Sequence, residues 1–209
     1  MFIQTLFRDP LAFFTMAAIV CFSVCCHEFM HAYTALRCGD DTAARCGHLT
    51  LNPLRQMGVI SLIMLAFIGI CWGQVPVDRN RLRSRACATL VALAGPLTNL
   101  ALAVIFAVLT YFALRADQSL PARFLAYGSV INFILTMINL LPVPGLDGWE
   151  ALNYFSRNGT KLNSEFSKGL VLFLMLAAFA GIKYIYALAE IMLMAVIKLI
   201  HLGLNWVNL

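Results

Sequence analysis

The chain has 209 residues, of which 61% are hydrophobic and 12% are charged, and its formal net charge is +5. Ordinary soluble domains are roughly 25% charged, so this chain has too few charges to coat a soluble globule, and its apolar content excludes a disordered protein. We therefore expect one integral-membrane domain over residues 1–209, embedded in a lipid bilayer.

Apolar runs of membrane character follow one another along the chain. A spanning helix needs about 20 mostly apolar residues, and the runs lie at 11–36, 59–72, 86–114, 122–141, 168–181 and 184–207. The second run is short and is followed by Gly73 and Pro76, so we expect either a re-entrant segment or a crossing with a returning limb. The sequence predicts an all-α polytopic membrane protein with five or six transmembrane segments.

Two short segments and seven cysteines lie in or between these runs. HLTLN (48–52) and WGQVPV (72–77) have the character of short strands, so a short β-strand element is expected. Most of the cysteines lie in or beside apolar runs, where cysteine packs as a small hydrophobic residue. Cys38, Cys46 and His48 lack the close ligand pair of a zinc knuckle. We therefore expect the cysteines to be packing residues.

The strongest chemical signal is the pentapeptide HEFMH at residues 27–31. On a helix, residues four apart lie on one face, so His27 and His31 can hold one Zn²⁺. Glu28, turned about 100° from His27 by the helical repeat, is then placed to act as general base. Such polar residues are costly inside a membrane helix and mark functional sites. The pattern therefore predicts a zinc site.

A third protein ligand is expected, because catalytic zinc sites ordinarily have three protein ligands and a water. The candidates are Glu190 in the last apolar segment and Asp147 in PVPGLDG. Asp147 follows a helix broken by two prolines, and a broken helix end lets a carboxylate approach a metal. The same Asp-Gly pair also suits a simple turn, so the residues alone leave the choice open.

Three motifs in fixed order carry a family resemblance: HEFMH, AGPLTN and NLLPVPGLDG. They resemble the site-2 proteases, which are intramembrane zinc metalloproteases with the motifs HExxH and NxxPxPxLDG. The resemblance spans about residues 10–160, which would form the catalytic core, followed by two C-terminal membrane segments at about 168–207. It implies that His27, His31 and Asp147 are the Zn²⁺ ligands and that Glu28 is the general base.

The same resemblance gives roles to two asparagines. Asn139, and Asn99 from AGPLTN, would position the substrate backbone or stabilise the oxyanion, although each also suits an interhelical hydrogen bond. Many relatives carry Gly-Arg where this chain has Trp149-Glu150, and lysine where it has Gln74. These differences leave the substrate-binding surface open. The chain is similar to a minimal form without a PDZ or nucleotide-sensing domain.

By this resemblance, the expected function is hydrolysis of peptide bonds within or near transmembrane segments, as in regulated intramembrane proteolysis. The substrates would be single-span membrane proteins, and an exposed strand edge would pair with an extended substrate segment. Two alternatives stay open at this point. One is a divalent-metal transporter, and the other is an inactive relative that binds membrane helices.

The topology follows from the need to place the ligands on one face of a core about 30 Å thick. His27 and His31 lie late in the first helix and Asp147 follows a later one, so segment 57–85 must leave and return to the same face. That face collects ten basic residues, against Arg8, Arg115, Arg123 and Lys183 on the other: Arg37, Arg45, Arg55, Arg79, Arg81, Arg83, Arg85, Arg157, Lys161 and Lys168. By the positive-inside rule it is cytoplasmic, in an expected prokaryotic cell membrane. We read these clusters as orientation signals and expect no nucleic-acid partner.

This topology predicts which positions react with a membrane-impermeant thiol reagent. Single cysteines replacing Thr42, Asn80 or Asn158, in an otherwise cysteine-free chain, should be labelled only from the cytoplasmic side of vesicles. One replacing Gln118 should be labelled only from the other side. Labelling of positions 42 and 80 from opposite sides would contradict the shared face.

Overall fold

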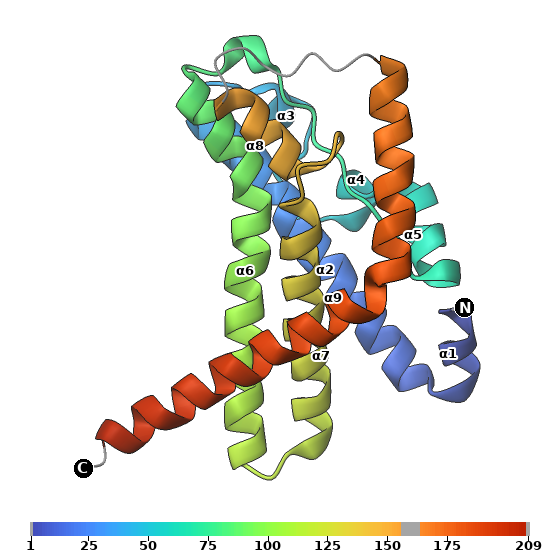
Figure 1. Ribbon diagram of the computed structural model, residues 1–209, viewed down its shortest axis with the longest axis vertical. Helices are drawn as coiled ribbons and strands as arrows, with labels where there is room; N and C mark the ends of the chain where they lie inside the picture. The colour runs from blue at the N-terminus through green and yellow to red at the C-terminus, as the bar shows by residue number, and fades with distance from the viewer. Residues whose placement is uncertain (1, 156–163, 208–209) are drawn as a thin grey trace.

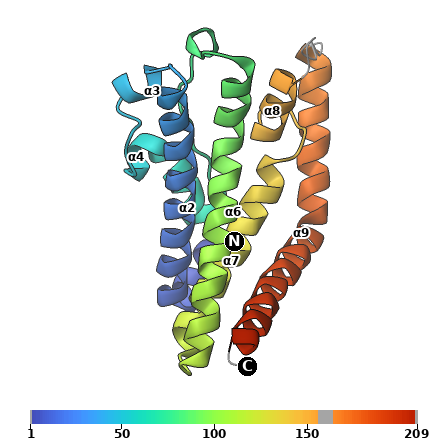
Figure 2. The same cartoon turned by 90° about the vertical axis from the view of Figure 1, so that its left-hand side faces the viewer.

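The computed structural model describes residues 2–155 and 164–207, and helices make up most of them. In chain order they are α1 (Ile3–Arg8), α2 (Pro10–Arg37), α3 (Thr42–Arg45), α4 (Pro53–Gln56), α5 (Gly58–Ile68), the 3-10 turn η1 (Arg79–Arg81), α6 (Arg85–Arg115), α7 (Ser119–Asn139), α8 (Asp147–Phe155) and α9 (Ser164–Val207). Helices α2, α6 and α7 lie side by side, with α9 along their outer side (Figures 1 and 2).

Four helical segments are long and apolar enough to cross a membrane: α2, α6, α7 and the Lys183–Leu204 part of α9. They confirm the all-α polytopic architecture and the runs expected at 11–36, 86–114 and 122–141. The two segments expected at 168–181 and 184–207 form one continuous helix, α9, which changes direction along its length (Figure 1). Gly181 interrupts the apolar pattern, but a helical glycine costs only about 1 kcal/mol relative to alanine.

Part of the segment 149–166, between the apolar runs at 122–141 and 168–181, lies outside the described residues. Its first part forms α8, whereas residues 156–163, with Arg157, Asn158 and Lys161, are not among the residues that the structure describes. The side chain of Lys168 is likewise outside the description.

The helices that carry the motifs begin at well-defined caps. The Asp9 carboxylate accepts a hydrogen bond from the Ala12 N–H at 3.0 Å, and Pro10 occupies the first helical position of α2. Ser84 accepts from the Cys87 N–H at 3.1 Å at the start of α6. Both patterns are typical helix starts, because an oxygen acceptor satisfies an N–H that has no partner within the helix.

Small residues let the central helices approach one another. Ala103 and Ala107 of α6 are fully buried against Val130 and Phe133 of α7. A Cβ on Gly128 of α7 would approach the Phe106 ring to 2.9 Å, closer than real Cβ contacts allow. Membrane helices are held largely by such close packing, because lipid gives little hydrophobic drive between them. Cys25 is 2% exposed and packs with Val20, Val24, Met57 and Leu65, as expected for a packing cysteine.

The segment between α2 and α6 leaves one end of the bundle and returns to it. Its apolar helix α5 has 11 residues, which is about 16 Å of helix and half of a hydrocarbon core. The Arg83 N–H donates to the Cys38 carbonyl at 3.1 Å, and the Asp78 N–H donates to the Asp40 carboxylate at 2.7 Å. The end of the segment therefore meets its beginning, and the expected return of 57–85 is confirmed.

The short β-strand element is not found in the part of the chain that the structure describes, so that part of the prediction was wrong. Residues 48–52 wrap around the side chain of Gln56, whose Nε2 donates to the carbonyls of His48 (2.8 Å) and Thr50 (2.6 Å). These carbonyls are therefore already engaged by a side chain rather than by a neighbouring strand. In residues 72–77, the Gln74 N–H donates to the Gln56 carbonyl at 3.0 Å, without a ladder around it.

Asp40 should stabilise the point at which the segment between α2 and α6 returns to its own beginning. It is fully buried, and besides Asp78 it accepts from the Thr42 N–H at 3.0 Å. Burial would raise the pKa of Asp40, but the hydrogen bonds from Thr42 and Asp78 and the charge of Arg81 hold it below its ordinary value. Asp40→Asn should lower the free energy of unfolding in detergent by about 1.5–3 kcal/mol. The native contribution should be present above about pH 4 and be lost as the pH falls through the lowered pKa.

The neighbouring carboxylate provides the control. Asp41 forms ion pairs with Arg45 and Arg81, each at 2.6 Å, in partly exposed positions. Such surface pairs contribute about 0–1 kcal/mol, so Asp41→Asn should change stability little. Equal losses in thermal unfolding of the two variants would rule out a special role for the buried Asp40.

Candidate functional site

Three side chains from distant parts of the chain converge where α2 meets the start of α8. His27 Nε2 lies 3.0 Å from Asp147 Oδ2, and His31 Nε2 lies 3.3 Å from Asp147 Oδ1. The two Nε2 atoms are 3.0 Å apart. Among the described residues these three form the one group of histidine, cysteine or acidic side chains close enough to share a metal ion. Glu190, the other candidate for third ligand, does not belong to it.

The hydrogen-bonding partners of the histidines fix what their Nε2 atoms can do. His31 Nδ1 lies 2.7 Å from the Val91 carbonyl oxygen, which only accepts, so Nδ1 carries the proton. His27 Nδ1 lies 2.5 Å from Asn99 Oδ1. With both Nδ1 atoms donating, a neutral imidazole has a lone pair on Nε2. Both lone pairs face the Asp147 carboxylate, whose buried Oδ2 has no hydrogen-bond donor.

This donor set fits a cation. Three acceptor atoms with no proton among them repel one another unless a positive charge lies between them, and two imidazole nitrogens with a carboxylate are typical zinc ligands. Histidine ligands of metals commonly donate their other ring N–H to a carbonyl or carboxylate, as both do here. The residues therefore fit a metal ion such as zinc.

Three glycines stand where there is no room for a Cβ atom in and around the site. A Cβ on Gly95 of α6 would overlap the Nε2 atoms of both His27 and His31, and a Cβ on Gly148 would overlap the Leu140 carbonyl. A Cβ on Gly73 would overlap the Glu28 carboxylate. The motifs contain Gly95 and Gly148, and Gly73 adjoins the short second run. None of the three is marked as part of the site by the sequence pattern alone.

Glu28 lies on α2 beside His27, and its carboxylate faces segment 72–77, which has no regular secondary structure. Its side chain is buried, with a residue exposure of 8%, and the close approach of Gly73 places the backbone of that segment directly against it. Glu28 does not belong to the group of His27, His31 and Asp147. A carboxylate next to a metal site but outside its ligand set is positioned to exchange a proton with a bound water.

The two asparagines occupy different positions. Asn99 is fully buried in α6, where its Oδ1 faces His27 and its Nδ2 donates to Asn132 Oδ1 at 2.9 Å. This location is behind the ligand and gives Asn99 a contact with His27 rather than with an approaching substrate. Asn139 is the last residue of α7, and its amide donates to the Leu135 carbonyl at 3.0 Å. A substrate or oxyanion role for Asn139 stays a prediction.

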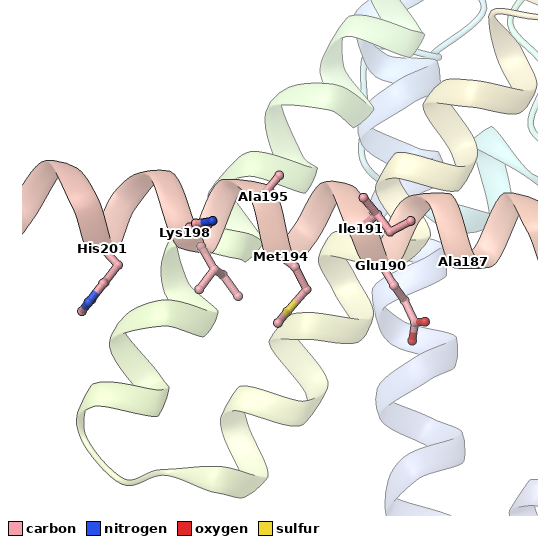
Figure 3. A pocket seen from close by; sticks show the side chains of 8 residues that line it. Ala187, Glu190, Ile191, Met194, Ala195, Lys198 and His201 are labelled. Carbon is pink, nitrogen blue, oxygen red and sulfur yellow. The ribbon is translucent and has the colours of Figure 1, made fainter.

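A groove with a volume of about 800 Å³ runs along α9, away from the group of His27, His31 and Asp147. Figure 3 shows that its lining side chains follow one another along that helix, and Glu190, Lys198 and His201 supply its charged or titratable groups. His201 is accompanied there by Tyr111 of α6, whose hydroxyl lies 3.4 Å from Nδ1. None of His27, His31 and Asp147 lines the groove, so the groove does not extend the site into a path of metal ligands.

Comparison with known proteins gives a family match and several relatives. A model described as "Peptidase family M50" matches residues 15–116, which include HEFMH and AGPLTN and end before Asp147. The chain is 33% identical over 177 residues to "Putative zinc metalloprotease YwhC" of Bacillus subtilis, covering 79% of this chain and 80% of that protein. It is 36% identical over 164 residues to "Putative zinc metalloprotease Rip2" of Mycobacterium tuberculosis, covering 75% and 63%. No solved structure matches the chain.

Gly95 gives a direct test of the geometry. In Gly95→Ala the added methyl group would push the two imidazoles apart, so zinc affinity should fall by about 10-fold or more, as when support of a ligand is lost. Competition with a chromogenic chelator measures that affinity. Gly203→Ala, in an open position of α9, is the matched control and should bind zinc as the native protein does. Unchanged affinity in Gly95→Ala would mean that the imidazoles do not meet beside α6.

Proposed function

The chain belongs to peptidase family M50, the site-2 protease family, and from that premise we propose that it is an intramembrane zinc endopeptidase. Its substrates in this proposal are single-span membrane proteins, cut within or near their transmembrane segments. The observation that carries the proposal is the convergence of His27, His31 and Asp147, with Glu28 beside them, among helices long and apolar enough to cross a membrane.

In this proposal the metal-site residues and Glu28 have separate roles in the hydrolysis. The imidazoles of His27 and His31 and the Asp147 carboxylate would hold the metal, and both Nδ1 atoms are already engaged by oxygen acceptors behind them. A bound zinc ion polarises a scissile carbonyl and lowers the pKa of its water to about 7. Glu28 takes the proton from the attacking water at its carboxylate and later delivers a proton to the leaving amine. Burial of Glu28 limits exchange of that proton with bulk water.

Segment 72–77 supplies a place for the substrate backbone. It has no regular secondary structure, it passes against Glu28 at Gly73, and it is not paired in a sheet within the described residues. A peptide bond in a membrane helix must lose its helical hydrogen bonds before it can be attacked. An extended substrate segment could recover some of them by pairing with this backbone, as in other strand-addition complexes.

We place the active site toward the cytoplasmic face of a prokaryotic cell membrane. The end of the bundle that carries the site also carries Arg37, Arg79, Arg81, Arg83 and Arg85 at the ends of α2 and in or beside η1 and α6. An excess of basic residues is typical of cytoplasmic loops. The relatives found are bacterial or archaeal proteins, which agrees with a prokaryotic membrane.

The separate roles of ligand and base can be tested on purified protein in detergent. Glu28→Gln should retain about one zinc per chain and lose cleavage of a single-span substrate by at least about 100-fold, since it removes the base but no ligand. Asp147→Ala should lose zinc and cleavage together. Loss of zinc from Glu28→Gln, or full activity in Asp147→Ala, would overturn the assignment.

The cleavage assay, together with a transport assay in vesicles, separates the competing functions. A chelator should abolish cleavage by the native protein, and added zinc should restore it. An inactive helix-binding relative would bind the substrate without cutting it under every condition. A divalent-metal transporter would instead move zinc across vesicles that contain the purified protein, whether or not Glu28 is replaced.

A further inference from the structure

A row of buried amides lies behind His27 and joins three helices. Asn99 of α6 faces His27 with Oδ1, and its Nδ2 donates to Asn132 Oδ1 of α7 at 2.9 Å. Asn132 Nδ2 donates to the Gly128 carbonyl and to Ser23 Oγ of α2, both at 2.8 Å. Asn99, Asn132 and Ser23 all have an exposure of 0%. Such complete burial is notable for three polar side chains that do not belong to the metal-ligating group.

The directions of the hydrogen bonds in this row follow from backbone carbonyls, chiefly the carbonyl of Gly128. The Gly128 carbonyl only accepts, so the NH₂ group of Asn132 must face it, and Oδ1 of Asn132 then faces Asn99. Asn99 must therefore present its own NH₂ group to Asn132, and its Nδ2 also approaches the Ser23 carbonyl at 3.4 Å. Its Oδ1 is left for His27, so His27 Nδ1 must be the donor and Nε2 carries the lone pair.

We propose that Asn132 is a positioning residue for the metal centre, which through Asn99 holds His27 in the tautomer that can bind metal at Nε2. The proposal rests on the proposed function only in taking the centre to be a zinc site. His31 reaches the same tautomer directly from the Val91 carbonyl. The Val91 carbonyl contacts His31 directly, whereas the Gly128 carbonyl acts on His27 through Asn132 and Asn99. Asn132 should therefore control the tautomer of His27 without affecting that of His31.

If Asn132 loses its amide, Asn99 keeps only the long contact of its Nδ2 with the Ser23 carbonyl, at 3.4 Å, to favour its orientation. The Asn99 side chain can then turn over and present its NH₂ group to His27 Nδ1. A histidine that accepts at Nδ1 carries its proton on Nε2, and that atom then has no lone pair for a metal. A purely structural Asn132 would instead affect packing of α2, α6 and α7 and leave the tautomer of His27 alone.

Three variants separate these roles. Asn132→Leu keeps the approximate shape and removes the amide. Asn132→Asp keeps a side-chain oxygen that accepts from the Asn99 amide in either protonation state, so it should retain the orientation of Asn99. Ser129→Ala is the matched control, since Ser129 is equally buried in α7 and donates to the Ala103 carbonyl of α6 at 2.9 Å, outside the row.

Two readouts are measured on these proteins in detergent. Ring ¹⁵N NMR spectra of the metal-free proteins, recorded at a pH high enough that the ¹⁵N shifts themselves show neutral imidazoles, report the tautomers. Chelator competition reports zinc affinity. We expect Asn132→Leu to shift His27, and not His31, toward the Nε2–H tautomer and to weaken zinc binding by about 10–100-fold. Ser129→Ala should stay within two- to threefold of the native affinity, and Asn132→Asp should recover most of it.

Unchanged tautomers and affinity in Asn132→Leu, or equal losses in Ser129→Ala, would overturn the proposal. If Asn132→Leu does not fold, the native metal-free protein still decides, because an Nε2–H tautomer of His27 there contradicts the row of fixed directions. The tautomer is read without zinc or substrate. A native protein that shows the expected tautomer but binds no zinc would refute the proposed function and leave this inference standing.

Discussion

The repulsion among three acceptor atoms is the constraint on which the rest of this structure depends. The Nε2 atoms of His27 and His31 and the carboxylate of Asp147 lie within hydrogen-bond distance of one another, and neutral imidazoles that donate at Nδ1 place no proton between them. In a membrane interior, where polar groups are costly, such a group persists only with a cation to share and a scaffold to hold it. The scaffold consists of carbonyl and amide acceptors behind the imidazoles and a glycine, Gly95, in front of them.

That constraint also accounts for the path of the chain between the motifs. Because the ligands come from α2 and from the start of α8, an odd number of crossings between them would separate the ligands by most of the membrane. The short helix α5 resolves this by entering and returning, and Asp40 joins the two ends of the excursion by binding the Asp78 N–H. The returning backbone passes Glu28 at Gly73. One segment thus preserves the topology and lines the site.

Features of the fold and the site that depend on neighbouring residues could be predicted from the sequence, whereas contacts between residues far apart in the chain could not. HEFMH lies within one helical turn, so its two imidazoles could be placed on one face without a structure, and the long apolar runs gave the spanning helices. Asp147 needed the family motif, because nothing local distinguishes a ligand from a turn. Asn132 and Ser23 were missed because their contact spans 109 residues. The expected strands failed because the side chain of Gln56 takes up carbonyls of residues 48–52, which no pattern of alternating residues reveals.

The central claim is that two imidazoles and one carboxylate, and no cysteine, hold a single zinc ion. X-ray absorption at the zinc edge of the purified protein tests it most directly, because nitrogen or oxygen ligands at about 2.0–2.2 Å are distinguished from sulfur at about 2.3 Å. We expect a shell of nitrogen and oxygen only, with the scattering pattern of two imidazole rings. A sulfur ligand would contradict it, since Cys25 and Cys26 directly precede His27. So would a site with a single imidazole.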